Sequence, residues 1–164
     1  MRQLWIRRPI GAWPLPALAA LLLLSGCALL ARPTQAPPMT PVEVVTKFYR
    51  WYIGYPANPL VDEAYKSSPY LSEELIQEIE ETLASFANGR SGPASAYDPI
   101  LLAQDIPESF TVEEESLSGD RATVIVHLFW GGNPTPSDRR VELERVRQDK
   151  EVRWKIVDIR LAEG

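Results

Sequence analysis

The sequence predicts a domain of the α+β class, with helices first and then a curved antiparallel meander of four strands. Apolar residues recur at helical spacing in the first part of residues 40–164, and the period changes to two from residue 110 onward. Loops of three, eight and four residues separate the four predicted strands. Connections this short join antiparallel neighbours, so the strands are expected to form a meander.

Residues 1–26 have the three zones of a secretory signal peptide. Arg2, Arg7 and Arg8 give a basic start, and residues 17–24 form an unbroken apolar run. The run is shorter than the roughly 20 residues that cross a bilayer. An uncleaved membrane helix over residues 10–30 is the alternative, and Pro14 and Pro16 disfavour it because they would break its hydrogen-bond ladder.

Residues 24–27, Leu-Ser-Gly-Cys, resemble the lipobox of bacterial lipoproteins. The resemblance implies that Cys27 receives diacylglycerol, that the peptide is cut before Cys27, and that the new N-terminus is acylated, for example with palmitate. Removal of the first 26 of the 164 residues leaves a mature chain of 138. Several acyl chains anchor stably, so we expect this chain on the outer side of the cell membrane or outer membrane of a bacterial envelope.

Residues 27–39 are predicted to be a lipid-anchored tether, and residues 40–164 a single domain. The tether contains Pro33, Pro37 and Pro38 and no hydrophobic period, which indicates an extended linker. The mature chain has 14 basic and 22 acidic residues, a formal charge of −8, which argues against a nucleic-acid partner. One cysteine and one histidine exclude a disulfide framework and a structural zinc site.

The first helix is predicted to begin after Thr40 and to end at Gly54. Thr40 can cap it, Pro41 suits its first turn, and Glu43 can complete a capping box with Thr40. The apolar stripe of this helix consists of Val45, Phe48 and Tyr52, widened by Val44, Tyr49 and Trp51.

Two further helical segments are predicted before the strands, in addition to a short one over residues 60–65. Ser72 can cap the second main helix, whose acidic first turn suits the helix dipole and which ends at Asn88-Gly89. Asp98-Pro99 is typical of a cap and first turn, so we expect a short helix over residues 98–103. The buried stripe of the second helix is predicted to consist of Leu75, Ile76, Ile79, Leu83 and Phe86.

The four strands are predicted over residues 110–117, 121–130, 139–147 and 152–161. Val124, Val126, Leu128 and Trp130 share one face of the second strand and form the predicted core stripe. The apolar residues of the last strand change phase after Ile156, which predicts a bulge. Basic and acidic residues alternate in the last hairpin, so we expect cross-strand ion pairs on a solvated face.

The order of these elements, ending in Val-Arg-Trp-Lys-Ile-Val-Asp-Ile over residues 152–159, resembles the nuclear transport factor two-like cone fold. Residues 48–52, 70–72 and 102–105 are similar to a bacterial domain of unknown function in that superfamily, whose members are often secreted or lipid-anchored. The resemblance implies a sheet wrapped around the helices with a pocket at the open end. It implies no particular activity, because the superfamily includes isomerases, dehydratases, binding proteins and interaction modules.

Seven polar or aromatic residues are candidates for lining such a pocket. Asp105 is the candidate general base of an isomerase- or dehydratase-like enzyme, but we favour a structural role in which it accepts backbone N–H groups. The aromatic residues of the first helix are favoured as core, and His127 lies on the strand face opposite the core stripe. The seven candidates are Tyr49, Trp51, Tyr52, Gln104, Asp105, His127 and Trp130.

We therefore expect a non-catalytic, membrane-tethered domain that binds a small molecule or an envelope protein. Ile125 and Phe129, on the outer face of the second strand, offer a surface for a homodimer. The enzyme with Asp105 as base is the alternative. The chain contains no nucleotide-phosphate loop, nucleophile elbow or metalloprotease motif, so no cofactor or metal is expected.

Overall fold

The computed structural model describes residues 38–88, 97–148 and 151–162. The predicted leader, the lipidation site Cys27 and most of the tether lie outside these residues. No helix within the described ranges has the length and apolar character needed to cross a membrane.

Helix α1 (Pro41–Ile53) begins and ends where the sequence predicts. The backbone N–H of Glu43 donates to Thr40 Oγ1 at 3.2 Å, and the N–H of Thr40 donates to Glu43 Oε2 at 2.8 Å, which completes the capping box. At the other end, the N–H of Gly54 donates to the carbonyl of Arg50. A Cβ at Gly54 would lie 2.9 Å from that carbonyl oxygen, so a side chain here would force the chain to shift.

Helix α2 (Glu73–Ala87) is capped by Ser72, whose Oγ accepts the N–H of Leu75 at 3.1 Å. Leu75 and Ile79 are buried as predicted. Ile76, Leu83 and Phe86, predicted in the same buried stripe, are only half-buried, and Leu83 and Phe86 line a cavity. The short helical segment lies later than predicted, as the 3-10 helix η1 (Ala64–Ser67).

The prediction of a helix over residues 98–103 is wrong, because these residues form a turn closed by a backbone hydrogen bond. The N–H of Asp98 donates to the carbonyl of Ala103 at 2.8 Å. The Asp98 carboxylate caps the turn as predicted, accepting the N–H groups of Ile100 and Leu101. Leu102 has φ +50°, in the left-handed region, where a right-handed helix cannot continue.

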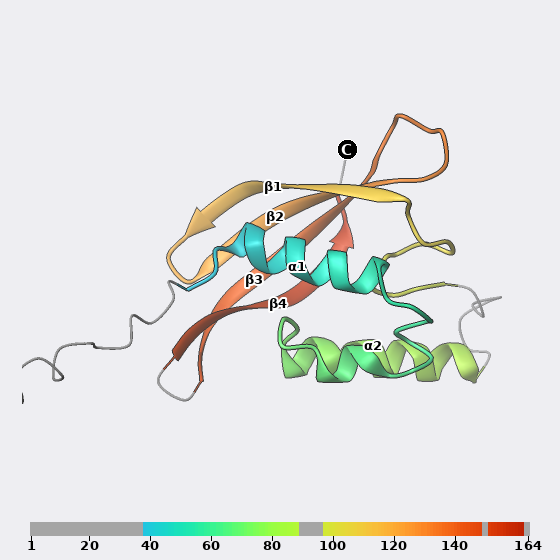
Figure 1. Ribbon diagram of the computed structural model, residues 1–164. Coiled ribbons are helices and arrows are strands. Elements are labelled where there is room, and N and C mark those ends of the chain that lie inside the picture. Colours follow the sequence, from blue (N-terminus) through green and yellow to red (C-terminus); the bar gives the residue numbers. More distant parts are fainter. Residues whose placement is uncertain (1–37, 89–96, 149–150, 163–164) are drawn as a thin grey trace, which may run out of the picture. The chain divides into compact units, whose positions relative to one another are not determined.

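The sheet is the predicted antiparallel meander, with strand order β1-β2-β3-β4 (Figure 1). Its strands are β1 (Ser109–Ser118), β2 (Arg121–Phe129), β3 (Ser137–Gln148) and β4 (Glu151–Leu161). The pairing of β3 with β4 passes over Val157, which confirms the bulge predicted in the last strand. A second irregularity, at Glu115 in β1, was not predicted.

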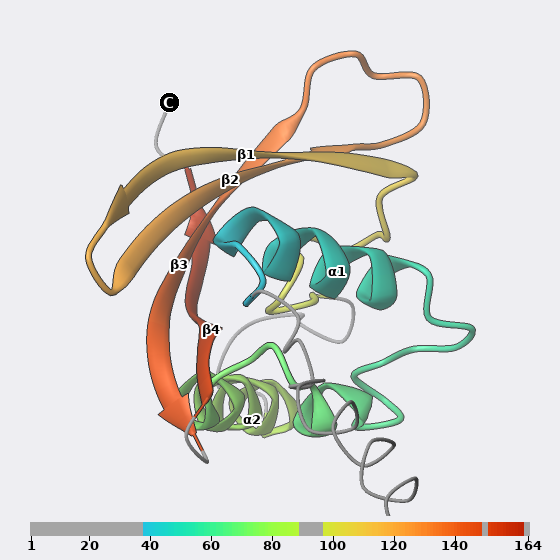
Figure 2. The same cartoon turned by 60° about the vertical axis from the view of Figure 1, so that its left-hand side comes forward.

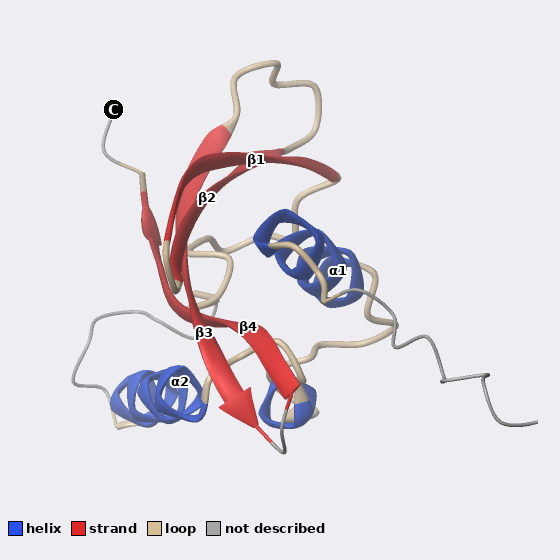
Figure 3. Ribbon diagram, turned by 90° about the vertical axis from the view of Figure 1, so that its left-hand side faces the viewer, coloured by secondary structure: helices blue, strands red, loops and turns tan. Residues whose placement is uncertain are grey.

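The curved sheet surrounds α1, which lies inside the arc of β1 and β2 (Figure 2, Figure 3). Three members of the predicted core stripe, Val124, Val126 and Leu128, are fully buried on the inner face of β2. The fourth, Trp130, follows the end of the strand and is half-buried. Helix α2 begins beside β4, where the N–H of Ile156 donates to the carbonyl of Tyr70 and the N–H of Ser72 donates to the carbonyl of Ile156. The α+β class with helices packed on a four-stranded antiparallel sheet is therefore confirmed.

The outer face of the sheet carries the predicted cross-strand ion pairs, among them Arg140 with Glu115 and Arg160 with Glu142. Arg139, which we expected on the same solvated face, is 1% exposed and faces the core. Ile125 lies between Glu113 and Arg140 in the register and is also buried. This face therefore shows little open apolar area, and the homodimer stays a prediction.

Candidate functional site

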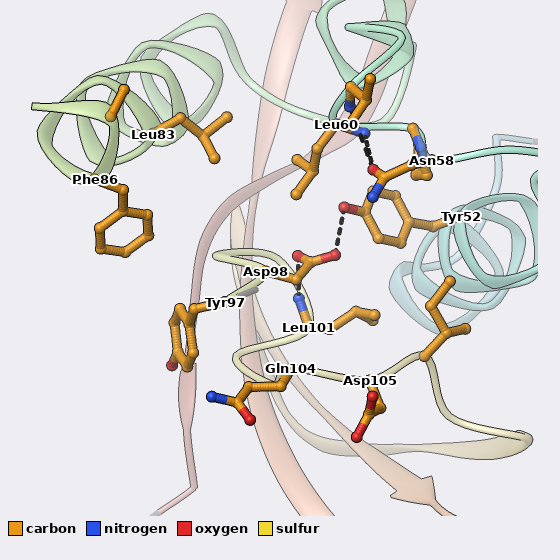
Figure 4. Close-up of a pocket in the computed structure, with 14 residues that line it drawn as sticks. Tyr52, Asn58, Leu60, Leu83, Phe86, Tyr97, Asp98, Leu101, Gln104 and Asp105 are labelled. Carbon is orange, nitrogen blue, oxygen red and sulfur yellow. Dashed lines mark hydrogen bonds between the residues drawn. The ribbon is translucent and has the colours of Figure 1, made fainter. Parts of the chain in front are cut away.

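A cavity of about 560 Å³ opens between the end of α1, the loop before η1, the C-terminal half of α2 and the turn that follows Tyr97 (Figure 4). This volume is within the range of ligand sites in proteins. Aliphatic and aromatic side chains make up most of its wall. The lining residues are Tyr52, Asn58, Pro59, Leu60, Val61, Leu83, Phe86, Ala87, Tyr97, Asp98, Leu101, Gln104, Asp105 and Ile106.

The Asp98 carboxylate lies in this wall with both oxygens engaged. Its Oδ2 accepts the hydroxyl of Tyr52 at 2.8 Å, and its Oδ1 accepts the N–H groups of Ile100 at 2.7 Å and Leu101 at 2.9 Å. Burial raises the pKa of Asp98, and these three hydrogen bonds oppose the rise. Asp98 therefore holds the turn in place and has little capacity left for a ligand.

Tyr52 is a hydrogen-bond donor that keeps its proton at neutral pH. Burial, followed by the charge of Asp98, raises the pKa of its hydroxyl far above the ordinary value. Because that hydroxyl donates to Asp98, it cannot also act as a proton donor toward a bound molecule.

Arg139 supports the same turn from below the cavity. Its guanidinium donates to the carbonyls of Leu101 at 2.6 Å and Leu102 at 3.2 Å, and also to Ser137 Oγ at 2.7 Å. Burial lowers the pKa of Arg139 from its high ordinary value. Within the described residues no carboxylate lies within ion-pair distance of this guanidinium, so peptide carbonyls and one hydroxyl solvate it.

Three of the seven sequence candidates line the cavity, namely Tyr52, Gln104 and Asp105. The side chains of Gln104 and Asp105 are exposed and make no hydrogen bond or ion pair with any described residue. The structural role expected for Asp105 therefore belongs to Asp98. The Asp105 carboxylate can accept a hydrogen bond from a ligand.

The other four candidates lie elsewhere. Tyr49 is fully buried in the core, and its hydroxyl has no partner among the described residues. Trp51 packs edge-on against Tyr52 and Tyr55. Trp130 donates its indole N–H to the carbonyl of Asp105 at 3.0 Å, which positions that residue's backbone.

His127 lies on the outer face of the sheet, as the strand alternation predicted. Its Nδ1 is 2.8 Å from Asp138 Oδ1 and its Nε2 is 3.6 Å from Glu113 Oε1. The three side chains come from β2, β3 and β1, away from the cavity lining.

Sequence reasoning missed several cavity residues, of which Asn58, Val61, Tyr97 and Ile106 matter most. Asn58 Oδ1 accepts the N–H groups of Leu60 and Val61, and so shapes the loop on one side of the cavity. Val61, Tyr97 and Ile106 lie in loops without a hydrophobic period, where no pattern links them. The local signal in this region is Asp98-Pro99, and it indicates a helix cap and not a cavity.

The part of the chain that forms this site is strongly acidic. Residues 52–106 supply every lining side chain and contain nine acidic and two basic residues, the latter being Lys66 and Arg90. Lys66 pairs with Glu63 at 2.9 Å and with Glu80 at 2.6 Å. Among the residues that the structure describes, the lining includes two aspartates and no lysine, arginine or histidine. The site is therefore a largely apolar cavity built from an acidic segment of the chain.

Comparison with known proteins gives one informative similarity. No protein-family model and no curated protein matches the chain. A chain in the crystal structure of the type VI native effector–immunity complex Tae3–Tai3 from Ralstonia pickettii is similar, with a TM-score of 0.53 and 24% sequence identity. The similarity covers 76% of this chain and 96% of that chain. At this identity it is a likeness of fold.

Proposed function

We propose that the protein is a lipid-anchored, extracytoplasmic domain that binds another protein of the cell envelope without catalysing a reaction. One observation carries the proposal: three apolar side chains are exposed at the opening of the cavity. Val61 is 77% exposed, Ile106 is 51% exposed and Tyr97 is 36% exposed. Exposed apolar groups gathered around a hollow are typical of interaction sites.

The position of these residues favours a protein over a small molecule. A small ligand inside the cavity would leave much of Val61 and Ile106 in contact with water. A protein surface can fill the cavity and also cover its rim, which is the usual anatomy of a protein interface.

The similar chain from Ralstonia pickettii also favours a protein over a small molecule as the partner. It is a chain of an effector–immunity complex, so a fold of this kind takes part in recognition between two proteins. We also propose that the fold is a cone of the nuclear transport factor two-like kind, supported by the sheet that curves around α1 (Figure 3).

Among the described residues, no acid is placed to work with Asp105 as the general base of the enzyme alternative. The hydroxyl of Tyr52 is committed to Asp98. Figure 4 shows the ring of Tyr97 beside Phe86, across the cavity from Asp105. General acid–base catalysis needs both groups within hydrogen-bond reach of one substrate. A carboxylate without a described partner, on a wall made mostly of aliphatic and aromatic side chains, suits binding better.

The proposed location of the protein in the cell rests on the lipobox-like residues 24–27. An acylated Cys27 followed by a proline-containing tether would hold the domain close to the cell membrane or outer membrane. Its partner would then be a protein resident in the envelope or one that passes through it.

The test is site-specific photo-crosslinking in cells that make the full chain. A photoreactive phenylalanine analogue replaces Ile106, Val61 or Tyr97 in separate variants, and Leu117 in the control. Leu117 in β1 is 51% exposed, as Ile106 is, and does not line the cavity. We expect the three cavity positions to crosslink to one protein, identified by mass spectrometry, and Leu117 not to.

The protein identified in this way is then purified and its affinity is measured. Ile106→Asp should weaken binding by about tenfold or more, as expected for a charge placed in an apolar contact, and Leu117→Asp should not. Equal crosslinking from Leu117, or binding that Ile106→Asp does not change, would contradict the proposal.

A further inference from the structure

We infer that the partner inserts an arginine or lysine side chain into this cavity, with its aliphatic stem along the apolar wall and its charged end at the Asp105 carboxylate. The inference rests on the proposed function, since it specifies the chemistry of the protein that occupies the site. Three features of the cavity lead to it.

The first feature is the wall. Leu60, Leu83 and Leu101 offer aliphatic surface, and Phe86 and Tyr97 meet edge-to-face with ring centroids 6.2 Å apart. Long basic side chains bury their methylene stems on such surfaces and place the cation near aromatic rings. At about 560 Å³ the cavity can also accept an apolar neighbour of the inserted residue.

The second feature is the supply of hydrogen-bonding groups. Asp98 already accepts three hydrogen bonds, and Asn58 Oδ1 accepts two from its own loop. Among the described lining residues, Asp105 has the carboxylate without a partner, and the Gln104 amide and the Tyr97 hydroxyl can each both donate and accept. Arginine and lysine carry donors only, so they match the Asp105 carboxylate, which only accepts.

The third feature is the electrostatic field. The described part of the lining contains no cationic residue, and Lys66 pairs with Glu63 and Glu80. An anionic ligand would meet two aspartates without a counter-charge. A cationic group would be attracted, with its largest effect on specificity and association rate because Asp105 is exposed to water.

The inference is tested on the purified full chain with capped tripeptides. The probe is Leu-Arg-Leu, and the matched controls replace arginine with citrulline, which keeps the shape without the charge, or with norleucine, which keeps the stem. The readout is the NMR signal of the Trp130 indole N–H, which donates to the carbonyl of Asp105 and is assigned with Trp130→Phe.

We expect the arginine peptide to shift this signal and to bind about two- to fivefold more tightly than the citrulline peptide, the value of an exposed ion pair. Asp105→Asn should abolish this preference. Asp62→Asn should keep it, because Asp62 is exposed in the same acidic region but does not line the cavity. Equal binding of the two peptides, or no shift, overturns the inference.

Two further outcomes separate the inference from the proposed function. If butylguanidinium alone binds as tightly as the arginine peptide, the cavity is a small-cation site and a protein occupant is overturned. If the crosslinked partner depends on Ile106 but binds Asp105→Asn and Asp62→Asn equally well, the proposed function holds and the basic side chain does not.

Discussion

Asp98 and Arg139 both bind the backbone of Leu101, one at its N–H and the other at its carbonyl. The N–H of Leu101 donates to the Asp98 carboxylate at 2.9 Å, and the carbonyl of Leu101 accepts from Arg139 Nε at 2.6 Å. The two side chains therefore hold the same turn by separate hydrogen bonds, without a direct ion pair between them. This arrangement fixes the wall of the cavity to the inner face of β3.

Replacement of Arg139 by methionine is expected to destabilise the fold by about 3 kcal/mol. The change leaves the carbonyls of Leu101 and Leu102 without their donor, and the first of these carbonyls is buried. Urea unfolding, followed by tryptophan fluorescence, measures this loss of unfolding free energy. Arg140→Met is the control, since Arg140 pairs with Glu115 on the outer face, and it should cost less than about 1 kcal/mol. An equal loss of unfolding free energy in the two variants would show that the hydrogen bonds of Arg139 to the turn do not stabilise the fold.

Tyr49 and Tyr52 lie one turn apart on α1, and loss of their hydroxyls should have different effects. Tyr52→Phe removes a hydrogen bond to a buried carboxylate and should cost about 1–3 kcal/mol. Tyr49→Phe removes a buried hydroxyl without a described partner and should leave stability unchanged or slightly higher. Thermal unfolding of the two variants side by side gives the comparison, and a larger loss for Tyr49→Phe would refute it.

The stability that Asp98 contributes should decrease as the pH rises. Its pKa in the folded protein lies above the ordinary value of 3.8, so the folded state binds the proton more tightly than the unfolded state does. The contribution is complete below pH 3.8 and is lost as the pH rises through the folded pKa. We expect the unfolding free energy of the wild type, measured relative to Asp98→Asn, to fall between these values. If the difference in unfolding free energy between the wild type and Asp98→Asn grew with pH instead, burial would not be the main influence on the pKa of Asp98.

Cys27→Ser should release the protein from the membrane. The serine hydroxyl does not replace the thiol in lipid attachment, and the anchor implied by residues 24–27 is lost. Fractionation of cells and mass spectrometry of the N-terminus provide the measurement. Detection of unmodified Cys27, still joined to residues 1–26, in the membrane fraction of the wild type would disprove lipidation.

The helices and strands could be predicted because their signals are local. The capping box at Thr40, the cap at Ser72 and the alternation along β2 each act within a few residues. The bulge at Val157 was also visible, as a change in the phase of apolar residues. These features need no knowledge of distant parts of the chain.

The turn and the cavity could not be predicted because they depend on contacts between distant residues. Residues 98–103 contain a helix cap, but the donors of Arg139 hold the carbonyls of Leu101 and Leu102 in another conformation. Arg139 is in phase with Val141 and Leu143 on the inner face of β3, yet its charge favoured the solvated side. Its acceptors lie 37 and 38 residues away, and no periodic pattern reports them.

Because α2 attaches to β4, the cavity can assemble only after the last strand has been synthesised. The segment at Tyr70 and Ser72 pairs with Ile156, and Lys155 Nζ donates to the carbonyl of Pro69. One wall of the cavity therefore belongs to a helix that has no docking edge until the fourth strand has been synthesised. During translation or export, a chain stopped before residue 151 would carry every lining residue and still have no assembled site. Premature truncation should thus abolish recognition even where all contact residues are present.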